Sequence, residues 1–155
     1  MSLAEDERIL KKILKSIINS TAGIKYVILV DDSGITLLSE SKFKLDDDAP
    51  VKKMGAIGGA VLRGGEEQGH ILGYGDIKLQ ITEYDKGMLF SHKIGGNGVM
   101  CIATERNVNI GFLKAVIKKW VPKLKSVLDR YLSTDQDAIK EELKGLLNST
   151  DTIPS

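Results

Sequence analysis

The sequence predicts an α/β sandwich of the α+β type, in which a five-stranded antiparallel sheet is flanked by helices. The main observation is the order of hydrophobic patterns along the 155 residues, which reads helix, two strands, helix, three strands, helix and a further C-terminal helix. The second observation is that consecutive strand-like runs are joined by short turn sequences, which predicts antiparallel neighbours. Helices placed around such a sheet pack against its faces and form a sandwich.

The N-terminal part predicts a helix followed by a β-hairpin. Ser2 and Glu5 form a capping-box pattern, so the helix is expected to begin there and to end near Asn19. The run KYVILV at 25–30 is continuously apolar and rich in β-branched residues, which predicts a strand covered on both faces. A turn at 31–34 leads to the returning strand at 35–40. The apolar face of the first helix comprises Leu10, Ile13, Leu14, Ile17 and Ile18.

The central helix is predicted to begin near Pro50 and to end within the glycine-rich stretch 63–69. It contains GAIGGA at 55–60, and each glycine inside a helix costs about 1 kcal/mol relative to alanine. Small residues four positions apart let a second helix or a sheet approach the backbone closely. We interpret this helix and the following strand as a self-association unit. The alternatives are that the glycines pack the helix on its own sheet or that they form a loop.

The C-terminal half predicts a three-stranded meander and two helices. Strands are expected at 76–84, 88–94 and 99–104, with turns at 85–87 and 95–98. In the first of these strands, Ile77, Leu79 and Ile81 are expected on one face. A long helix follows at 109–131, and Pro122 is expected to kink or split it.

A second capping box, formed by Ser133 and Gln136, predicts a separate short helix that ends near Leu147. The sequence therefore divides into a domain at 1–132, a C-terminal helical extension at 133–148 and a disordered tail at 149–155. The extension has an apolar stripe and a net acidic charge. It is expected either to pack on its own domain or to offer a helix to another subunit.

Composition indicates an ordinary globular protein of the cytoplasm. Hydrophobic residues make up 42% and charged residues 28% of the chain, and the net charge of +1 argues against binding to nucleic acid through overall charge. A single cysteine, Cys101, rules out an internal disulfide and fits a reducing compartment. The charged N-terminus does not read as a signal peptide, and no apolar run is long enough for integral membrane association.

Motifs for enzyme chemistry are missing from the sequence. The stretch 64–70 is acidic where a phosphate-binding loop needs lysine, so no cofactor is expected. Two distant histidines and one cysteine predict no metal site. Cys101 is expected in the core with a raised pKa, and His92 on the surface. The run Asp46–Asp48 allows a cation site, although a solvated helix start is favoured. We therefore expect a binding module without catalytic residues.

The order of elements, the hairpin sequence YVILVDDSG at 26–34 and the NIGFL sequence at 109–113 together resemble the roadblock/dynein light chain family. The resemblance covers residues 5–131 and implies a profilin-like roadblock sandwich. It also implies a non-enzymatic dimer, formed with itself or with a paralogous roadblock subunit, that binds a Ras-like small GTPase as an activator, exchange assistant or scaffold. The implied dimer interface comprises Val51, Met54, Ile57, Gly58, Val61, Ile77, Leu79 and Ile81.

Two further interpretations remain from the sequence. Arg106 lies between a strand and a helix and is the arginine expected on a loop, so it is the candidate for assisting GTP hydrolysis. The alternative function is a ligand- or membrane-sensing, longin-like trafficking module, in which the basic helix from Lys114 to Lys125 would lie on an anionic membrane. A solvated helix face explains these lysines more simply.

Overall fold

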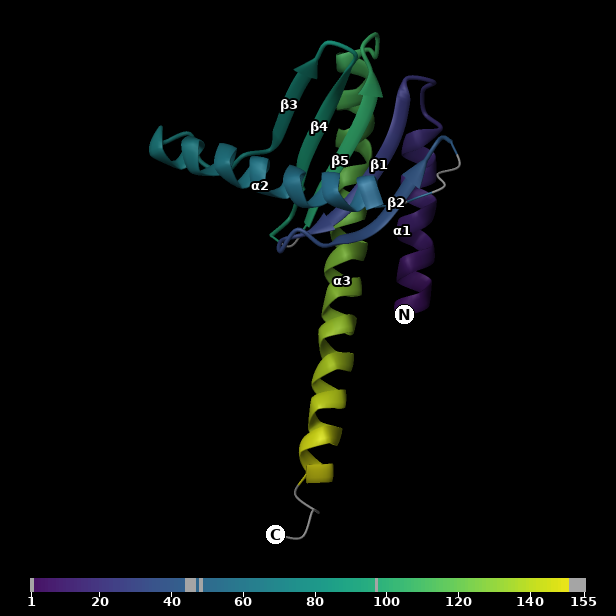
Figure 1. The fold of residues 1–155 in the computed structure, drawn as a ribbon, viewed down its shortest axis with the longest axis vertical. Coiled ribbons are helices and arrows are strands. Elements are labelled where there is room, and N and C mark those ends of the chain that lie inside the picture. Colours follow the sequence, from purple (N-terminus) through teal and green to yellow (C-terminus); the bar gives the residue numbers. More distant parts are fainter. Residues whose placement is uncertain (1, 44–46, 48, 97, 151–155) are drawn as a thin grey trace.

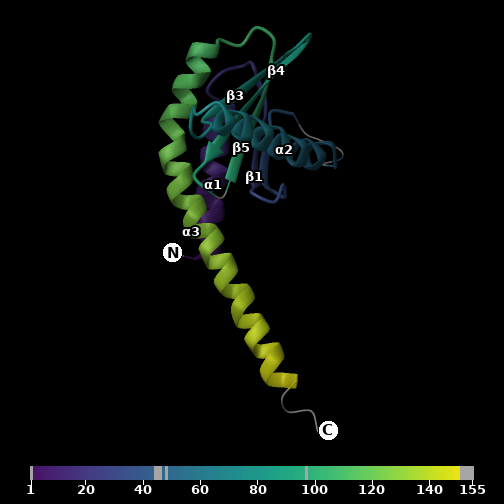
Figure 2. The ribbon, with the colours of Figure 1, turned by 90° about the vertical axis from the view of Figure 1, so that its left-hand side faces the viewer.

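A single antiparallel sheet lies between two layers of helices in this computed structural model, which describes residues 2–43, 47, 49–96 and 98–150. Helix α2 crosses one face of the sheet, and α1 and α3 cover the other face (Figures 1 and 2). The predicted order of elements and fold class are confirmed. The elements are α1 (Leu3–Ile18), β1 (Ile24–Asp31), β2 (Thr36–Ser41), α2 (Ala49–Ile71), β3 (Leu79–Tyr84), β4 (Gly87–Ile94), β5 (Gly98–Glu105) and α3 (Ile110–Thr150).

The five strands are arranged in the order β2-β1-β5-β4-β3, and every neighbouring pair is antiparallel. This order places β1 inside the sheet, where side chains alternate between two apolar layers. Val27 and Leu29 belong to the core on the side of α1 and α3, whereas Ile28 and Val30 belong to the core under α2. The prediction of a strand covered on both faces is therefore confirmed.

The larger core lies between the sheet and the helices α1 and α3. The apolar face predicted for α1 is buried there, and Phe90, Ile102 and Leu124 are fully buried beside it. The predicted cap is also present, because the Ser2 hydroxyl accepts a hydrogen bond of 3.2 Å from the backbone N–H of Glu5. A capped helix with one apolar stripe folds against the sheet in a single orientation.

The predicted break between two C-terminal helices is wrong, since α3 is one helix of 41 residues from Ile110 to Thr150. Figure 2 shows that α3 changes direction along its length but remains continuous. Pro122 is exposed, so water can hydrate the carbonyl that loses its helical partner. In the expected cap region, Thr134 donates its hydroxyl hydrogen to the carbonyl of Arg130 at 2.9 Å, which is a mid-helix arrangement. Residues 149 and 150 of the expected disordered tail belong to the helix. The rest of that tail, 151–155, lies outside the described residues.

Helix α2 is longer than predicted. It continues through the glycine-rich stretch 63–69 and ends at Ile71. Gly73, two residues beyond the last helical residue, terminates the helix and has a φ of 72°. The N–H of Gly73 donates to the carbonyl of His70 at 3.1 Å, and the N–H of Tyr74 donates to the carbonyl of Gly69 at 2.8 Å. This bond pattern is a Schellman motif, which satisfies the last carbonyls of a helix. The helix therefore ends where glycine adopts the left-handed conformation and not at the first glycines in the sequence.

The strand after α2 is shorter than predicted, and this changes the place of Ile77. Because β3 begins at Leu79, Ile77 lies outside the strand and packs in the α2-side core. Leu79 packs on the opposite side of the sheet, against the core under α1 and α3. The prediction that Ile77, Leu79 and Ile81 share a face is wrong for Ile77. Alternation applies only within a paired strand, so it cannot be extended to residues before the first pair.

Candidate functional site

Helix α2 lies unusually close to its own sheet, and its glycines explain how. A Cβ atom added to Gly55 would lie 2.5 Å from the Oγ1 of Thr36, and one added to Gly58 would lie 2.8 Å from the Sγ of Cys101. Neither position has room for a side chain. Gly55 and Gly58 therefore pack α2 on its own sheet, which was the simpler of the interpretations open from the sequence.

An apolar groove runs along the flank of α2 that lies nearer to strands β3 and β4, between the helix and these strands. Ile57 and Val61 form its helix wall and are 58% and 46% exposed, which is high for branched apolar side chains. Thr82 and Leu89 form its floor on the α2 face of the sheet. The groove has a volume of about 540 Å³. Apolar side chains gathered around a groove of this size mark a surface suited to a partner.

The groove adjoins the edge of the sheet. Strand β3 is the last strand on this side, and the described residues place no strand beyond it. Tyr84, at the end of β3, lines the groove and is 57% exposed. An open strand edge presents backbone donors and acceptors for another strand. We call the combination of Met54, Ile57, Val61, Tyr84 and the outer edge of β3 the α2–β3 surface.

The residues predicted for a dimer interface are divided between this surface and the interior. Met54, Ile57 and Val61 line the groove. Gly58 also reaches it, but is itself buried. Val51 is 6% exposed and belongs to the core under α2. On the strand, Ile81 is 37% exposed but faces the side of α1 and α3, because it is paired with the core residue Phe90.

Sequence reasoning missed the groove-lining residues Thr82, Tyr84 and Leu89. Their strand alternation was visible, but it could not show where α2 crosses the sheet. Arg106 was correctly placed on an exposed turn, between β5 and α3. It lies with Glu83, Tyr84 and Asp85 in a shallow polar depression at the end of β3.

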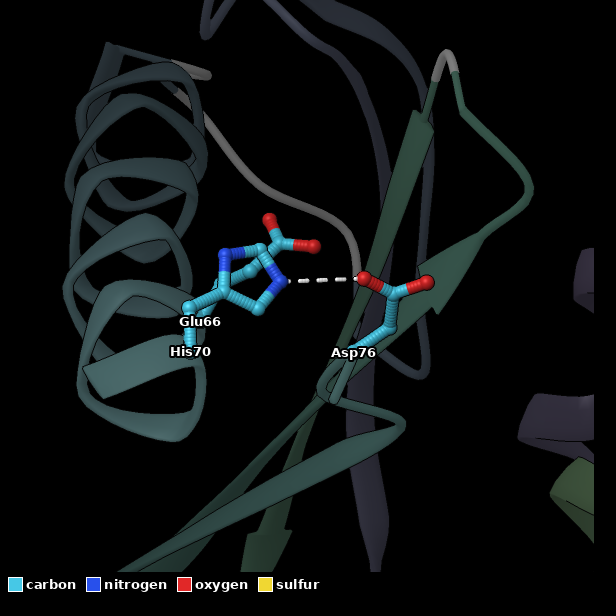
Figure 3. A group of neighbouring side chains, drawn as sticks. All are labelled: Glu66, His70 and Asp76. Atoms are coloured by element: carbon cyan, nitrogen blue, oxygen red, sulfur yellow. Dashed lines mark hydrogen bonds and ion pairs between the residues drawn. The ribbon is translucent and has the colours of Figure 1, made fainter. Parts of the chain in front are cut away.

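Three side chains near the C-terminal end of α2 also come together. The ligand atoms of Glu66, His70 and Asp76 lie within 4.8 Å of one another (Figure 3). His70 Nε2 is 3.1 Å from an Asp76 oxygen, and Lys93 Nζ is 2.5 Å from a Glu66 oxygen. The hydrogen bond from His70, followed by the charge of Lys93, lowers the pKa of Asp76. These contacts account for the positions of the three side chains without a metal ion.

Of the aspartates at 46–48, which the sequence offered as a cation site, only Asp47 belongs to the described residues. Its carboxylate accepts a hydrogen bond from the N–H of Ala49.

The remaining titratable candidates lie in or near the core. Cys101 is fully buried, and burial raises the pKa of its thiol, as predicted for a core residue. His92 is half-buried, which corrects the surface prediction. Burial lowers the pKa of its imidazole, while a 2.8 Å hydrogen bond from Nδ1 to the carbonyl of Lys93 acts in the opposite direction. Within the described residues, Cys101 Sγ lies 3.8 Å from the hydroxyl oxygen of Ser91, and His92 is hydrogen-bonded to a backbone carbonyl.

No profile of a known protein family matches the chain. Uncharacterized proteins MJ0310 and MJ1340 of Methanocaldococcus jannaschii are each 24% identical over 110 residues, which cover 71% of this chain and 92% of each relative. A structure described as MglB with tetrameric arrangement has a TM-score of 0.73 at 13% sequence identity. The superposition covers 81% of this chain and 92% of the MglB chain.

A Roadblock/LC7 domain from Streptomyces avermitilis has a TM-score of 0.69 at 18% identity, covering 76% of this chain and 95% of that domain. This chain has the Roadblock/LC7 fold. Gliding protein MglB from Thermus thermophilus has a TM-score of 0.71 at 13% identity, covering 84% of this chain and 93% of its own. The roadblock fold expected from the hairpin and the order of elements is therefore confirmed. Within the described residues, no helix combines the length and the apolar character needed to cross a bilayer.

Proposed function

We propose that this chain is a non-enzymatic roadblock-type regulator or scaffold that acts as a dimer and binds a Ras-like small GTPase. The observation that carries the proposal is the α2–β3 surface on a roadblock fold. In this proposal, the α2 helices of two protomers pack against each other, and the β3 edges pair so that one sheet continues through both copies. The partner copy is this chain itself or a paralogous roadblock chain.

The properties of the α2–β3 surface support a two-fold symmetric arrangement. A two-fold interface brings each patch against its own copy, so the patch must be self-complementary. An apolar groove beside an exposed apolar helix face meets this condition, because the helix of one protomer can fill the groove of the other. The open edge of β3 adds backbone hydrogen bonds at the same place. Val51 and Gly58 would act from inside each protomer by holding α2 in position.

We expect Ile57→Glu to abolish this dimer. The variant places a charge in the centre of an apolar contact, where an unpaired carboxylate is strongly disfavoured. Sedimentation velocity should therefore show a lower mass for the variant than for the wild type, and circular dichroism should show an unchanged helix content. Ile35→Glu is the matched control, because Ile35 is 62% exposed in the β1–β2 turn and lies outside the groove. A wild-type protein that lacks any α2-dependent association would overturn this part of the proposal.

The GTPase is best sought by affinity capture with the bound nucleotide as the variable. Immobilised protein should retain a Ras-like GTPase from the lysate of its source cell in one nucleotide state, either with a GTP analogue or with GDP. Retention in one state means that the switch loops are part of the contact. The Ile57→Glu variant should lose the GTPase if the two protomers build the binding surface together. No retained GTPase in either state would contradict the regulator function and leave a scaffold for other chains.

Arg106 is the candidate within this proposal for a direct effect on hydrolysis. Its exposed turn places it next to the end of β3, and an arginine supplied to a GTPase can stabilise the transition state. If Arg106 acts in this way, Arg106→Ala should slow stimulated GTP hydrolysis by about tenfold or more without loss of binding. Unchanged hydrolysis would restrict Arg106 to a surface charge.

A further inference from the structure

The C-terminal half of α3 carries an apolar surface exposed to solvent. We call residues 131–150 the tail helix, and Figures 1 and 2 show that it projects beyond the sheet and beyond α1. The side chains of its apolar stripe are exposed to between 50% (Ile139) and 67% (Leu146). Amphipathic helices owe most of their stability to packing of the apolar face. The stripe comprises Ile139, Leu143, Leu146 and Leu147.

We propose that the tail helix docks into the α3–β3 groove of a second copy of this chain, and that the second copy docks its own tail helix in return. The α3–β3 groove lies on the opposite side of the sheet from the α2–β3 surface, between the N-terminal half of α3 and strand β3. It has a volume of about 480 Å³. Leu79, Ile117 and Val121 supply its apolar lining, and Lys78, Lys114 and Lys118 line it with positive charge.

Charge complementarity identifies a second copy as the occupant. The tail sequence STDQDAIKEELKGLLNST at 133–150 contains four carboxylates and two lysines. The N-terminal half of α3, at 110–125, contains five lysines and no carboxylate. One helix is thus basic in its first half and acidic in its second half, so two such helices attract each other in antiparallel orientation. Exposed ion pairs contribute little affinity, but they select partner and orientation.

The spacing of residues along α3 permits this exchange. Val121 and Ile139 are 18 residues apart and Lys114 and Leu146 are 32 apart, which is close to five and nine turns of 3.6 residues, so each pair lies on one face of the helix. The apolar stripe of the tail therefore faces the same side as the groove-lining lysines. Each half of α3 is about 30 Å long at 1.5 Å per residue.

A two-fold axis near residue 130 would set Ile139 of one copy opposite Val121 of the other. It would likewise set Leu146 opposite Lys114, at the far end of the groove. Such an arrangement is isologous, since each copy gives one tail helix and receives one. The α3–β3 groove shares strand β3 with the α2–β3 surface but lies on the opposite face of the sheet, so dimers formed through α2 and β3 would be linked further into tetramers.

Charge reversal tests the exchange in a background that removes association through α2. The parent is the full chain with Ile57→Glu, which we expect to remain dimeric through its tails across micromolar concentrations. A tail variant carries Asp135→Lys and Glu142→Lys, which flank the apolar stripe. A groove variant carries Lys118→Glu and Lys125→Glu, at the positions that this register sets opposite Glu142 and Asp135. Each variant alone should be monomeric in sedimentation velocity, because like charges meet at both contacts. An equimolar mixture of the two should restore the dimer mass.

The matched control reverses Asp137 and Glu141 to lysine on the face away from the stripe, and it should leave the dimer intact. A parent that is monomeric at every concentration would overturn the proposal, and so would a mixture that fails to restore the dimer. The tail helix would then serve a different partner. Failure of the α2–β3 proposal is recognised separately, since Ile57→Glu would then leave the wild-type mass unchanged.

Disulfide capture tests the antiparallel register. Cys101 is buried and does not compete with engineered thiols. Mixing the Leu146→Cys and Lys114→Cys variants under mild oxidation should give a cross-linked dimer, whereas each variant alone should not. Glu141→Cys, on the opposite face of the tail, should not cross-link to Lys114→Cys. Equal cross-linking of both pairs would contradict the register.

Discussion

Replacing Arg130 with methionine is expected to destabilise the protein by about 3–5 kcal/mol, because it leaves a buried carboxylate without its cation. Asp6 of α1 is fully buried, and one of its oxygens accepts a 3.0 Å hydrogen bond from Nε of Arg130 and forms an ion pair with a terminal nitrogen of Arg130 at 2.9 Å. This pair joins the first helix to α3 across 124 positions of sequence. Urea unfolding measures the loss without a contribution from association when both proteins carry Ile57→Glu together with Asp135→Lys and Glu142→Lys, which are expected to make the chain monomeric.

Two comparisons separate the buried charge from the lost packing. Asp6→Leu combined with Arg130→Met removes both charges, and its stability should return close to that of the parent or above it. Lys11→Met breaks the exposed pair between Lys11 and Glu7, whose side chains are 52% and 41% exposed, and should change stability by less than about 1 kcal/mol. A loss for Arg130→Met no larger than that for Lys11→Met would contradict the role assigned to the pair between Arg130 and the buried Asp6.

Gly55→Val is expected to destabilise the protein by about 1–3 kcal/mol through overpacking. The new side chain would meet Thr36, whose Oγ1 lies 2.5 Å from the position of the added Cβ, and Val30, whose Cγ2 lies 3.1 Å from it. The helix can make room only by moving away from the sheet. That movement would alter the groove formed by Ile57 and Val61, so association through α2 should weaken as well. Urea unfolding in the Ile57→Glu parent measures the first effect, and sedimentation of Gly55→Val alone measures the second.

Gly64→Ala is the control for Gly55→Val on the same helix. No atom lies within 4 Å of a Cβ added at Gly64. Alanine should therefore stabilise the Ile57→Glu parent by about 0.5–1 kcal/mol, since it removes the entropic cost of glycine inside a helix. Opposite signs at the two positions would distinguish a glycine needed for close approach from one that the helix tolerates. A loss at Gly64 as large as that at Gly55 would contradict this distinction.

Local sequence was sufficient for most elements of the fold. The cap at Ser2, the apolar stripe of α1 and the buried run of β1 depend on neighbouring residues, and all three were predicted correctly. Local signals failed where two of them competed. The capping-box pattern at Ser133 did not end a helix, because continuing an existing helix avoids the cost of nucleating a new one. In α2, Gly64 and Gly65 read as a helix end, but the Schellman motif at Gly73 terminates it.

At the α2–β3 surface, too, the local pattern predicted the helix face but not which of its residues are exposed. Periodicity alone placed Val51, Met54, Ile57 and Val61 on one side of a helix. It could not tell that Val51 is covered by the sheet while Ile57 and Val61 stand beside an open groove. That difference arises because α2 crosses the strands and covers only part of the sheet. Burial along one stripe therefore changes with the distance from the crossing.

Local patterns of residues specify the order of elements, the roadblock-like hairpin, the small residues of α2 and the opposite charges of the two halves of α3. These features follow from periods of two and 3.6 residues, which are encoded locally. Packing between distant segments sets which residues of each stripe are exposed, that α3 is one helix and that its tail helix projects beyond the domain. Those outcomes depend on contacts between segments distant in sequence, such as Gly58 with Cys101 and Asp6 with Arg130, and no local pattern specifies such contacts.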